Sequence, residues 1–204
     1  APIKETLAAG LMRITEWDGT ISLVDPLCGS GTFLIEALSS LLGIASGLDR
    51  EFLFKNWPDF DLALWDKELA VAKKVKPFDG QLPKIIGCDL DKNIAYSAID
   101  NVKRSGFENY IEIINSPFQE LKLPSGCGLL VCNPPYGKRI GDENQLPNLY
   151  KELGNFCKKN ASGWDLWLLN GNPKLSKNLG MKASRRFQVN NGSIDCRWLH
   201  YKIK

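Results

Sequence analysis

Short apolar runs alternate with segments of helical periodicity along most of this 204-residue chain, and no other feature of the sequence restricts the fold as strongly. The runs predicted to form strands are 22–27, 84–90, 110–115, 129–132 and 164–169. The segments predicted to form helices are 4–15, 32–42, 91–105 and 146–159, and 118–121 could add a short helix. This alternation indicates an α/β fold with a mostly parallel sheet and helices on both faces. Because the strands are almost continuously apolar, we expect both of their faces to be covered.

The chain departs from this alternation in two places. Near the carboxyl end, two strand-like runs, 185–189 and 196–203, flank Asn190-Asn191-Gly192, and Asn-Gly between such runs is a strong signal for a β-hairpin. The sheet is therefore predicted to end in an antiparallel pair. Residues 44–80 form an insert before the second strand, with Leu62, Trp65 and Leu69 at helical spacing. We expect this insert to have a small apolar face of its own.

The composition is that of a globular domain, with 44% hydrophobic and 24% charged residues. It excludes a disordered chain, a collagen and a coiled coil. No apolar run approaches the ~18 residues of a membrane span, and no signal peptide precedes the first helix. We therefore expect a cytoplasmic protein with no membrane partner, and we interpret the chain as one part of a longer protein.

Positive charge is concentrated at the carboxyl end. Residues 174–204 carry eight basic side chains against one acidic one, a charge of +7, whereas the remainder has 18 basic and 22 acidic residues, a charge of −4. The eight are Lys174, Lys177, Lys182, Arg185, Arg186, Arg197, Lys202 and Lys204. Such asymmetry suggests an anionic partner near this tail. The alternative is that these side chains only solvate exposed strand faces.

The six cysteines do not predict a metal site. None forms a C-x-x-C pair, and His200 is the only histidine, so the ligand spacing of a zinc site is missing. Several cysteines lie inside apolar runs, where a thiol behaves as a small hydrophobic group. We expect reduced, structural cysteines and no metal.

A glycine turn follows the first predicted strand, in the sequence Asp25-Pro26-Leu27-Cys28-Gly29-Ser30-Gly31-Thr32. This is the carboxyl end of a central strand, where open α/β sheets bind ligands, and the two glycines let the backbone come close to one. The turn is not a P-loop, because no Gly-Lys-Ser/Thr follows, and Leu34 replaces the third glycine of a dinucleotide motif. The alternative is a tight turn with Asp25 as its cap.

An acidic residue, Asp89, ends the second predicted strand. A carboxylate at this place can accept hydrogen bonds from both hydroxyls of a ribose. The usual spacing from the glycine turn is about 20 residues, and the insert lengthens it here. The glycine turn and Asp89 together predict a site for a nucleoside-containing cofactor that is not a dinucleotide.

Two consecutive prolines follow the fourth predicted strand, in Cys132-Asn133-Pro134-Pro135-Tyr136-Gly137. They make the exit of the strand rigid and leave carbonyl groups exposed. The Asn133 side-chain oxygen and the Pro134 carbonyl can both accept hydrogen bonds from one amino group, and Tyr136 offers a ring on which a base could stack. The alternative is a Pro-Pro turn capped by Asn133. We favour the site because both turns open at the same edge of the expected sheet.

Together these motifs resemble the class I S-adenosylmethionine-dependent methyltransferases, and Asn133-Pro134-Pro135-Tyr136 narrows the resemblance to members that methylate amino groups. Over nearly the whole chain, the sequence resembles the catalytic domain of the THUMP-linked ribosomal RNA guanine-N2 methyltransferases. The matching segments are 1–9, 25–32, 133–140, the insert with Trp57 and Trp65, and Asn191-Gly192. The resemblance implies a Rossmann-like sheet of seven strands with an antiparallel last strand, and a THUMP domain upstream of Ala1.

The resemblance also implies a role for each motif. The implied S-adenosylmethionine-binding residues are Asp25, Cys28, Gly29, Ser30, Gly31, Thr32, Asp89, Leu90, Ser116 and Asn133. The implied catalytic residues are Asn133, Pro134 and Tyr136, of which the first two hold the guanine N2 amine and the third stacks on the flipped base. Relatives usually carry an acidic residue after the third strand, whereas this chain has Asn115-Ser116, so one of these two takes the contact near the adenine.

Three other functions remain open from the sequence. DNA adenine-N6 methylation would use the same platform for a planar amine, although such enzymes usually need a target-recognition segment. Glutamine methylation of release factors shares Asn-Pro-Pro-Tyr, but the basic tail argues against it. A non-catalytic nucleic-acid-binding module would not need Asp25, Asp89 and Asn133 together.

Overall fold

The computed structural model describes residues 2–48, 50–74, 81–136 and 145–204. They form two compact units, which we treat separately: the sheet unit, Ala1–Ala37 with Leu82–Lys204, and the insert unit, Leu38–Gln81. The segment Asn133-Pro134-Pro135-Tyr136 is called the prolyl turn. Two segments used in the sequence argument lie outside the described residues: 137–140, after the prolyl turn, and 75–80, at the end of the insert.

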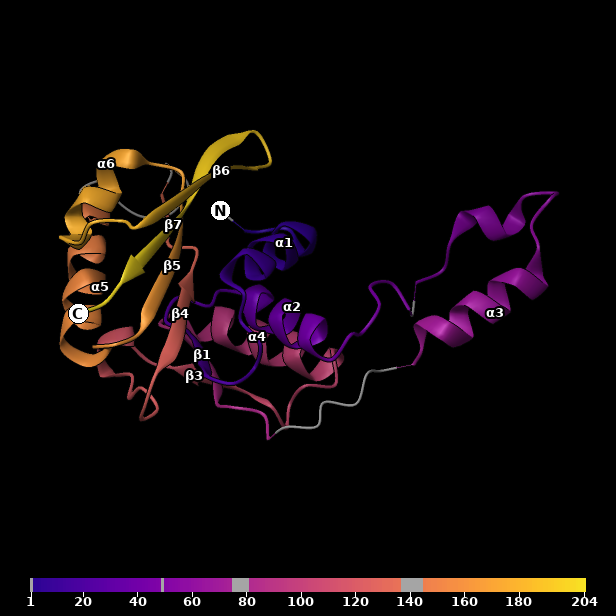
Figure 1. Cartoon of the computed structure of the whole chain (residues 1–204), viewed down its shortest axis with the longest axis horizontal. Coiled ribbons are helices and arrows are strands. Elements are labelled where there is room, and N and C mark those ends of the chain that lie inside the picture. Colours follow the sequence, from indigo (N-terminus) through magenta and orange to yellow (C-terminus); the bar gives the residue numbers. More distant parts are fainter. Residues whose placement is uncertain (1, 49, 75–80, 137–144) are drawn as a thin grey trace. The chain divides into compact units, whose positions relative to one another are not determined.

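The sheet unit is built on a seven-stranded mixed sheet (Figure 1). Its strands are β1 (Ser22–Asp25), β2 (Ile85–Asp89), β3 (Ile111–Asn115), β4 (Gly128–Cys132), β5 (Asp165–Asn170), β6 (Arg185–Asn191) and β7 (Ile194–Lys202). They follow the order β3-β2-β1-β4-β5-β7-β6, in which β7 pairs antiparallel with both β5 and β6 and the other four pairs are parallel. The predicted α/β class, the mostly parallel sheet and the antiparallel carboxyl-terminal hairpin are confirmed.

Helices cover both faces of this sheet, with α5 and α6 on one side and α1, α2 and α4 on the other (Figure 1). Their bounds are α1 (Glu5–Thr15), α2 (Thr32–Leu41), α4 (Lys92–Arg104), α5 (Leu146–Asn160) and α6 (Pro173–Ser176). Two 3-10 turns, η2 (Phe118–Glu120) and η3 (Lys177–Leu179), complete the unit. The sequence did not predict α6 and η3, because two turns of a few residues carry too little periodicity to be recognised.

The central strands are buried as their composition predicted. All five residues of β4 are buried, and so are Leu23, Val24 and Asp25 of β1. The carboxyl-terminal strands add an aromatic layer, in which Trp198 stacks on Phe33 of α2 with ring centroids 5.4 Å apart. This core fixes the positions of β1, β2 and β4, whose carboxyl ends carry the predicted motifs.

The insert unit contains η1 (Leu53–Asn56) and α3 (Leu62–Ala72), which begins after the N-cap Asp61. Phe52, Phe54 and Trp65 contact one another, as expected for a separate apolar cluster. Leu62 is 61% exposed at the first position of the helix, so it adds little to the packed apolar face that its spacing with Trp65 and Leu69 suggested. Among the described residues, no helix combines the length and the apolar character needed to cross a membrane.

Candidate active site

The glycine turn lies between β1 and α2, as predicted. Gly29 and Gly31 have positive φ angles of 55° and 80°, which side chains with a Cβ rarely adopt. The turn is closed by a hydrogen bond from Gly31 N to the Cys28 carbonyl at 2.9 Å, and Cys28 N donates to the Cys88 carbonyl of β2 at 2.8 Å. The two glycines are therefore required by the path of the backbone at the end of β1.

Asp25 organises this turn from inside the protein. Its side chain is 1% exposed, and its Oδ1 accepts a hydrogen bond from Leu27 N at 3.0 Å. Burial raises the pKa of Asp25 to about 8, and the nearby carboxylate of Asp89 adds to this effect, while the bond from Leu27 opposes it. The structure thus gives Asp25 the capping role of the alternative interpretation, and its contact with a cofactor stays a prediction.

Asp89 connects the end of β2 to the glycine turn. Its Oδ2 accepts a hydrogen bond from Gly29 N at 3.1 Å, and its Oδ1 accepts one from Asp91 N at 2.9 Å. Burial raises the pKa of Asp89, and the two backbone bonds partly oppose this. A carboxylate oxygen can accept more than one hydrogen bond, so this half-buried group retains acceptor capacity for the two hydroxyls of a ribose. The residues present therefore fit the nucleoside part of S-adenosylmethionine.

The remaining predicted cofactor residues surround these two acids. Ser30 and Thr32 are joined through their hydroxyl oxygens at 2.9 Å. Leu90 is 69% exposed directly after Asp89, and such an exposed apolar side chain can cover the face of a base. Ser116, at the end of β3, accepts a hydrogen bond from Cys88 Sγ to its carbonyl at 3.0 Å. The register of β2 with β3 pairs Asp89 with Asn115, which brings Leu90 and Ser116 to the same edge.

Two asparagines support this edge, of which the sequence argument considered only Asn115, as one of two candidates for the contact near the adenine. Asn115 Nδ2 donates to the Asp89 carbonyl at 2.9 Å and to the Leu90 carbonyl at 3.0 Å, so it holds the backbone after β2. Asn101 Nδ2, on α4, donates to the Ser30 carbonyl at 2.9 Å. The position of Asn115 at a strand end indicated that it could support the site. Nothing in the sequence distinguishes Asn101 from other polar residues of an exposed helix.

The prolyl turn lies on the strand next to β1. Parallel pairing of β1 with β4 aligns Val24 with Leu130, so Asn133 and Pro134 leave the sheet at the same edge as Asp25. Pro134 is buried and Asn133 is half-buried. The structure therefore brings the two predicted motifs to neighbouring strand ends, as the expected strand order required.

No group of three or more potential metal ligands occurs among the residues with a described position.

Tyr136 is held more tightly than the sequence suggested. Its side chain is 5% exposed, and its hydroxyl oxygen accepts a hydrogen bond from Asn191 Nδ2 of β6 at 2.8 Å. Cys196 Sγ of β7 lies 3.7 Å from the same oxygen. A Cβ on Gly171 would lie 2.5 Å from the Tyr136 ring, so the end of β5 needs a glycine here. In this arrangement the ring is packed inside the protein, and stacking on a base would require it to become accessible.

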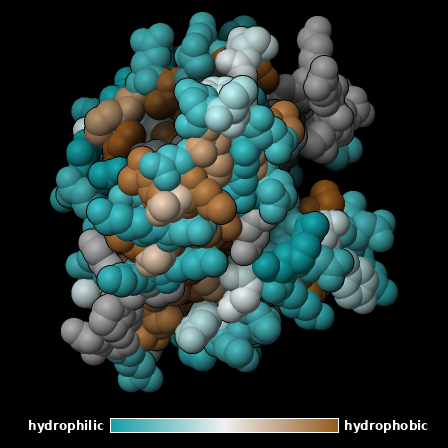
Figure 2. All heavy atoms as spheres, turned by 90° about the vertical axis from the view of Figure 1, so that its right-hand side faces the viewer, coloured by the Kyte–Doolittle hydropathy of each residue, from teal (hydrophilic) through white to brown (hydrophobic). Residues whose placement is uncertain are grey.

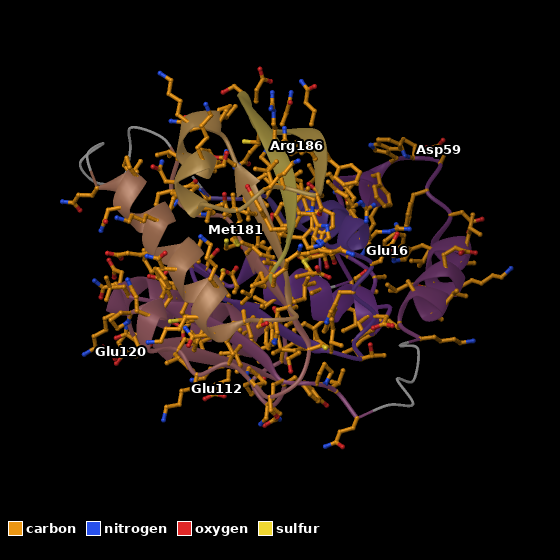
Figure 3. All side chains as sticks on the ribbon, turned by 60° about the vertical axis from the view of Figure 1, so that its left-hand side comes forward. Glu16, Asp59, Glu112, Glu120, Met181 and Arg186 are labelled. Atoms are coloured by element: carbon orange, nitrogen blue, oxygen red, sulfur yellow. The ribbon has the colours of Figure 1, made fainter. Side chains whose placement is uncertain are left out.

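The basic tail is spread over α6, η3 and the hairpin. Arg185 and Arg186 begin β6 and are exposed, and Arg186 is labelled on this hairpin in Figure 3. The Arg185 guanidinium lies 5.2 Å from the ring centroid of Phe187 and 5.6 Å from that of Trp167. Exposure of these side chains is compatible with an anionic partner and equally with simple solvation of the strands.

Comparison with known families identifies the family of this chain. The family model described as "RMKL-like, methyltransferase domain" matches residues 1–200. The chain belongs to this family. The predicted membership of the class I methyltransferases is thereby confirmed, as are the fold and the topology that the resemblance implied.

Relatives of this RMKL-like domain are considerably longer than the chain itself. A ribosomal RNA large subunit methyltransferase K/L of Marinomonas is 38% identical over the whole chain, which spans 29% of that protein. A protein provisionally assigned as an RNA methyltransferase in Synechocystis is 40% identical, again over the whole chain, which spans 53% of it. The chain therefore spans about half or less of the length of these relatives.

Solved structures share the fold of the RMKL-like domain over the full chain. SMU.472, provisionally assigned as a methyltransferase and crystallised with SAH, is 32% identical with a TM-score of 0.91, and the chain spans 53% of it. A predicted N6-adenine-specific DNA methylase from Listeria monocytogenes is 30% identical with a TM-score of 0.87, and the chain spans 52% of it.

Proposed function

We propose that this domain transfers the methyl group of S-adenosylmethionine to the exocyclic N2 amine of a guanine in RNA, and that its substrate is large-subunit (23S) ribosomal RNA. The observation that carries the proposal is the parallel register of β1 with β4, which places the glycine turn and Asn133-Pro134 at adjacent strand ends. The names of the relatives support the choice of ribosomal RNA.

In this proposal, the β1–β2 side of the edge holds the cofactor. The backbone of Gly29 and Gly31 lines its methionine end, together with Asp25, Cys28, Ser30 and Thr32. Asp89 accepts hydrogen bonds from the ribose, and Leu90 and Ser116 contact the adenine. Asn101 and Asn115 contribute indirectly, because they fix the backbone on which Ser30 and Asp89 stand.

The β4 side of the edge holds the amine that is methylated. The Asn133 side-chain oxygen and the Pro134 carbonyl accept the two hydrogens of the amine, which directs the nitrogen lone pair away from them. S-adenosylmethionine supplies an electrophilic methyl sulfonium when bound, so a strong base is not needed. Methyl transfer would form the N–C bond as the S–C bond breaks, with S-adenosylhomocysteine as the leaving group, and the proton lost by the methylated amine would pass to solvent. Positioning of the amine accounts for much of the expected rate enhancement.

The exposed basic side chains of α6 and the hairpin would contact RNA phosphates. If they do, the logarithm of RNA affinity falls with the logarithm of the salt concentration, with a slope of about −0.7 for each phosphate contact to a single strand. Filter binding of a ribosomal RNA fragment over a range of salt concentrations measures this slope. An RNA affinity that does not change with salt concentration would show that the basic tail does not contact RNA phosphates.

DNA adenine-N6 methylation is the second candidate, because the similar structure from Listeria monocytogenes is that of a predicted N6-adenine-specific DNA methylase. An exocyclic N6 amine would fit the same two acceptors. Nothing in Asn133 or Pro134 distinguishes the amine of an adenine from that of a guanine. The choice between the bases therefore has to be measured.

The test is methyl transfer by the longest natural protein that contains this domain. We would incubate it with isotopically labelled S-adenosylmethionine and either undermethylated large-subunit RNA, duplex DNA or a release factor, and identify the modified nucleoside by mass spectrometry. We expect N2-methylguanosine only. N6-methyldeoxyadenosine in DNA would establish the second candidate instead, and transfer only to the release factor, or to none of the three, would contradict the proposal.

Asn133→Ala separates the two halves of the site. It removes one acceptor for the amine, so we expect methyl transfer to fall by at least about a hundredfold while S-adenosylhomocysteine binds as in the wild type. Calorimetric titration provides the binding measurement, with Asp89→Asn as the matched variant that should weaken binding of the cofactor. Loss of both properties in Asn133→Ala would indicate misfolding rather than a role in catalysis.

A further inference from the structure

The insert unit contains a pocket that the proposed methyl transfer does not use. It has a volume of about 380 Å³, within the range typical of ligand sites. Four aromatic rings line it, those of Phe54, Trp57, Phe60 and Trp65. Figure 2 shows apolar side chains at the surface of this unit, bordered by hydrophilic ones. The pocket is therefore an aromatic cavity that is open at the surface of the insert.

Phe54 meets two tryptophans of this pocket at steep angles, and one of them, Trp57, is largely exposed. Phe54 meets Trp57 at 63° with centroids 6.3 Å apart, and it meets Trp65 at 68° with centroids 5.4 Å apart. Trp57 is 66% exposed. Exposed faces of aromatic rings carry partial negative charge and attract cations. This geometry suits a positively charged group better than a flat aromatic one.

Carboxylates line the same pocket, and no basic side chain does. They belong to Asp59, Asp61 and Glu68, all exposed, and the label in Figure 3 marks Asp59 in the loop before α3. Asp61 is partly engaged, because it accepts a hydrogen bond from Leu64 N at 2.9 Å as the helix cap. Three negative groups beside open ring faces disfavour a phosphate-bearing ligand and favour a cationic one.

The insert itself shows that these rings accept cations. The Lys55 ammonium lies 4.9 Å from the ring centroid of Trp65, outside the residues that line the pocket. The Arg50 guanidinium lies 5.7 Å from the centroid of Phe52 in the same aromatic cluster. Two basic side chains of the chain are thus already placed over rings of this cluster, and one of these rings, Trp65, also lines the pocket. The pocket offers further ring faces of the same kind, together with carboxylates.

We propose that this pocket binds an arginine or lysine side chain of a basic protein segment. The charged head would lie among the rings and carboxylates, and the aliphatic stem would contact the apolar walls. Leu64, which lines the pocket, is 52% exposed, and Leu53, which precedes Phe54 in the chain, is 84% exposed, which gives a surface wider than a free amine would cover. A protein segment, rather than a small organic cation, is therefore the ligand that this surface fits.

The experiment measures binding of a short fluorescein-labelled peptide of arginine, lysine and glycine to the full chain at physiological ionic strength. Two variants test the pocket, Trp57→Ala and the double variant Asp59→Asn/Glu68→Gln. The matched control is Glu51→Gln/Asp66→Asn, which removes the same charge from exposed acids of the insert that do not line the pocket. Circular dichroism checks that each variant is folded.

We expect both pocket variants to weaken peptide binding by about tenfold, and the control to change it by less than about twofold. A peptide with acetylated lysines and citrulline in place of arginine should not bind. Equal weakening by the pocket and control variants would overturn the proposal in favour of unspecific charge attraction. No binding to the wild type, binding of free trimethylamine as tight as the peptide, or tighter binding of a labelled RNA oligonucleotide that Trp57→Ala weakens would also overturn it.

Discussion

The two aromatic groups of this protein are built from similar residues and differ in how their rings meet. In the sheet unit, Trp167 stacks on Trp198 at 25° and on His200 at 23°, and the two tryptophans are 2% and 0% exposed. In the insert unit, Phe54 meets Trp57, Phe60 and Trp65 at 46° to 68° and stacks on Phe52, at 26°, and Trp57 is 66% exposed. Neighbouring strands present side chains in parallel rows that can stack. The insert rings come from a 3-10 turn, a short helix and the loops beside them, and most of these rings meet at steep angles.

This difference separates aromatic residues that stabilise the fold from those that remain available for contact. A buried stack contributes the free energy of its removal from water. An open cluster contributes less of this free energy and retains ring faces for a ligand. Composition alone would not distinguish the two, because both regions contain phenylalanine and tryptophan.

The largest expected effect on stability distinguishes two truncations, one tryptophan in each region. Trp198→Ala leaves a cavity between Phe33 and Trp167, so we expect the free energy of unfolding to fall by about 3–5 kcal/mol. Trp57→Ala removes an exposed ring, and we expect a change within about 0.5 kcal/mol. Urea unfolding followed by circular dichroism measures both. Similar losses in the two variants would show that the insert rings are as structural as the stack.

Burial in the sheet unit also affects a carboxyl group. Since the pKa of Asp25 rises from 3.8 unfolded to about 8 folded, the native state retains a proton that the unfolded chain releases. The free energy of unfolding should therefore fall as the pH rises through this interval, by up to ~1.4 kcal/mol for each pH unit. Asp25→Asn should flatten this part of the pH profile. Asp18→Asn is the control, because the pKa of Asp18 is lowered by its bonds to Thr20 and lies below this range.

A smaller effect is expected at Tyr136. Tyr136→Phe removes the oxygen that accepts the hydrogen bond from Asn191, and leaves a buried donor without this acceptor. We expect a loss of about 1–2 kcal/mol in the same unfolding measurement. Trp57→Phe in the insert should cost less than this. If Tyr136→Phe were neutral, the contact between the hairpin and the prolyl turn would not contribute to stability.

The smallest effects concern cations placed over rings in the two regions. Arg185→Ala should lower the free energy of unfolding by about 0.5–1 kcal/mol, because the guanidinium contacts two rings, those of Trp167 and Phe187. Lys55→Ala should cost about 0.5 kcal/mol or less, since one flexible ammonium lies over Trp65. Thermal unfolding at low and at high salt measures the loss of stability in each variant. A larger loss for Lys55→Ala would reverse the expected order.

Much of the fold followed from local patterns in the sequence. The apolar runs predicted five parallel strands, and Asn191-Gly192 predicted the hairpin, because burial on both faces and a tight turn each leave a local signature. Gly29, Gly31 and Asp89 were recognisable for the same reason. The strand order that places Asn133 beside Asp25 came from the known behaviour of α/β sheets and agrees with the structure.

Contacts between distant residues could not be predicted in this way. Nothing in the sequence pairs Tyr136 with Asn191, 55 positions away, or Asn101 with Ser30, 71 positions away. The exposure of Leu62 and the pocket of the insert depend on where α3 begins and how its rings tilt. These properties arise from packing in three dimensions, and short helical spacings do not determine it.

The distribution of the cysteines makes one position of the protein chemically distinct. Cys127 is exposed, whereas the other five thiols are buried. Burial raises the pKa of Cys28, Cys88, Cys132 and Cys157, so these thiols remain protonated and unreactive at neutral pH. A maleimide dye should therefore attach at Cys127 alone. Since Cys127 precedes β4 and Asn133 follows it, the dye would lie about 17 Å or more from the prolyl turn, where it can report on a bound partner without occupying the site.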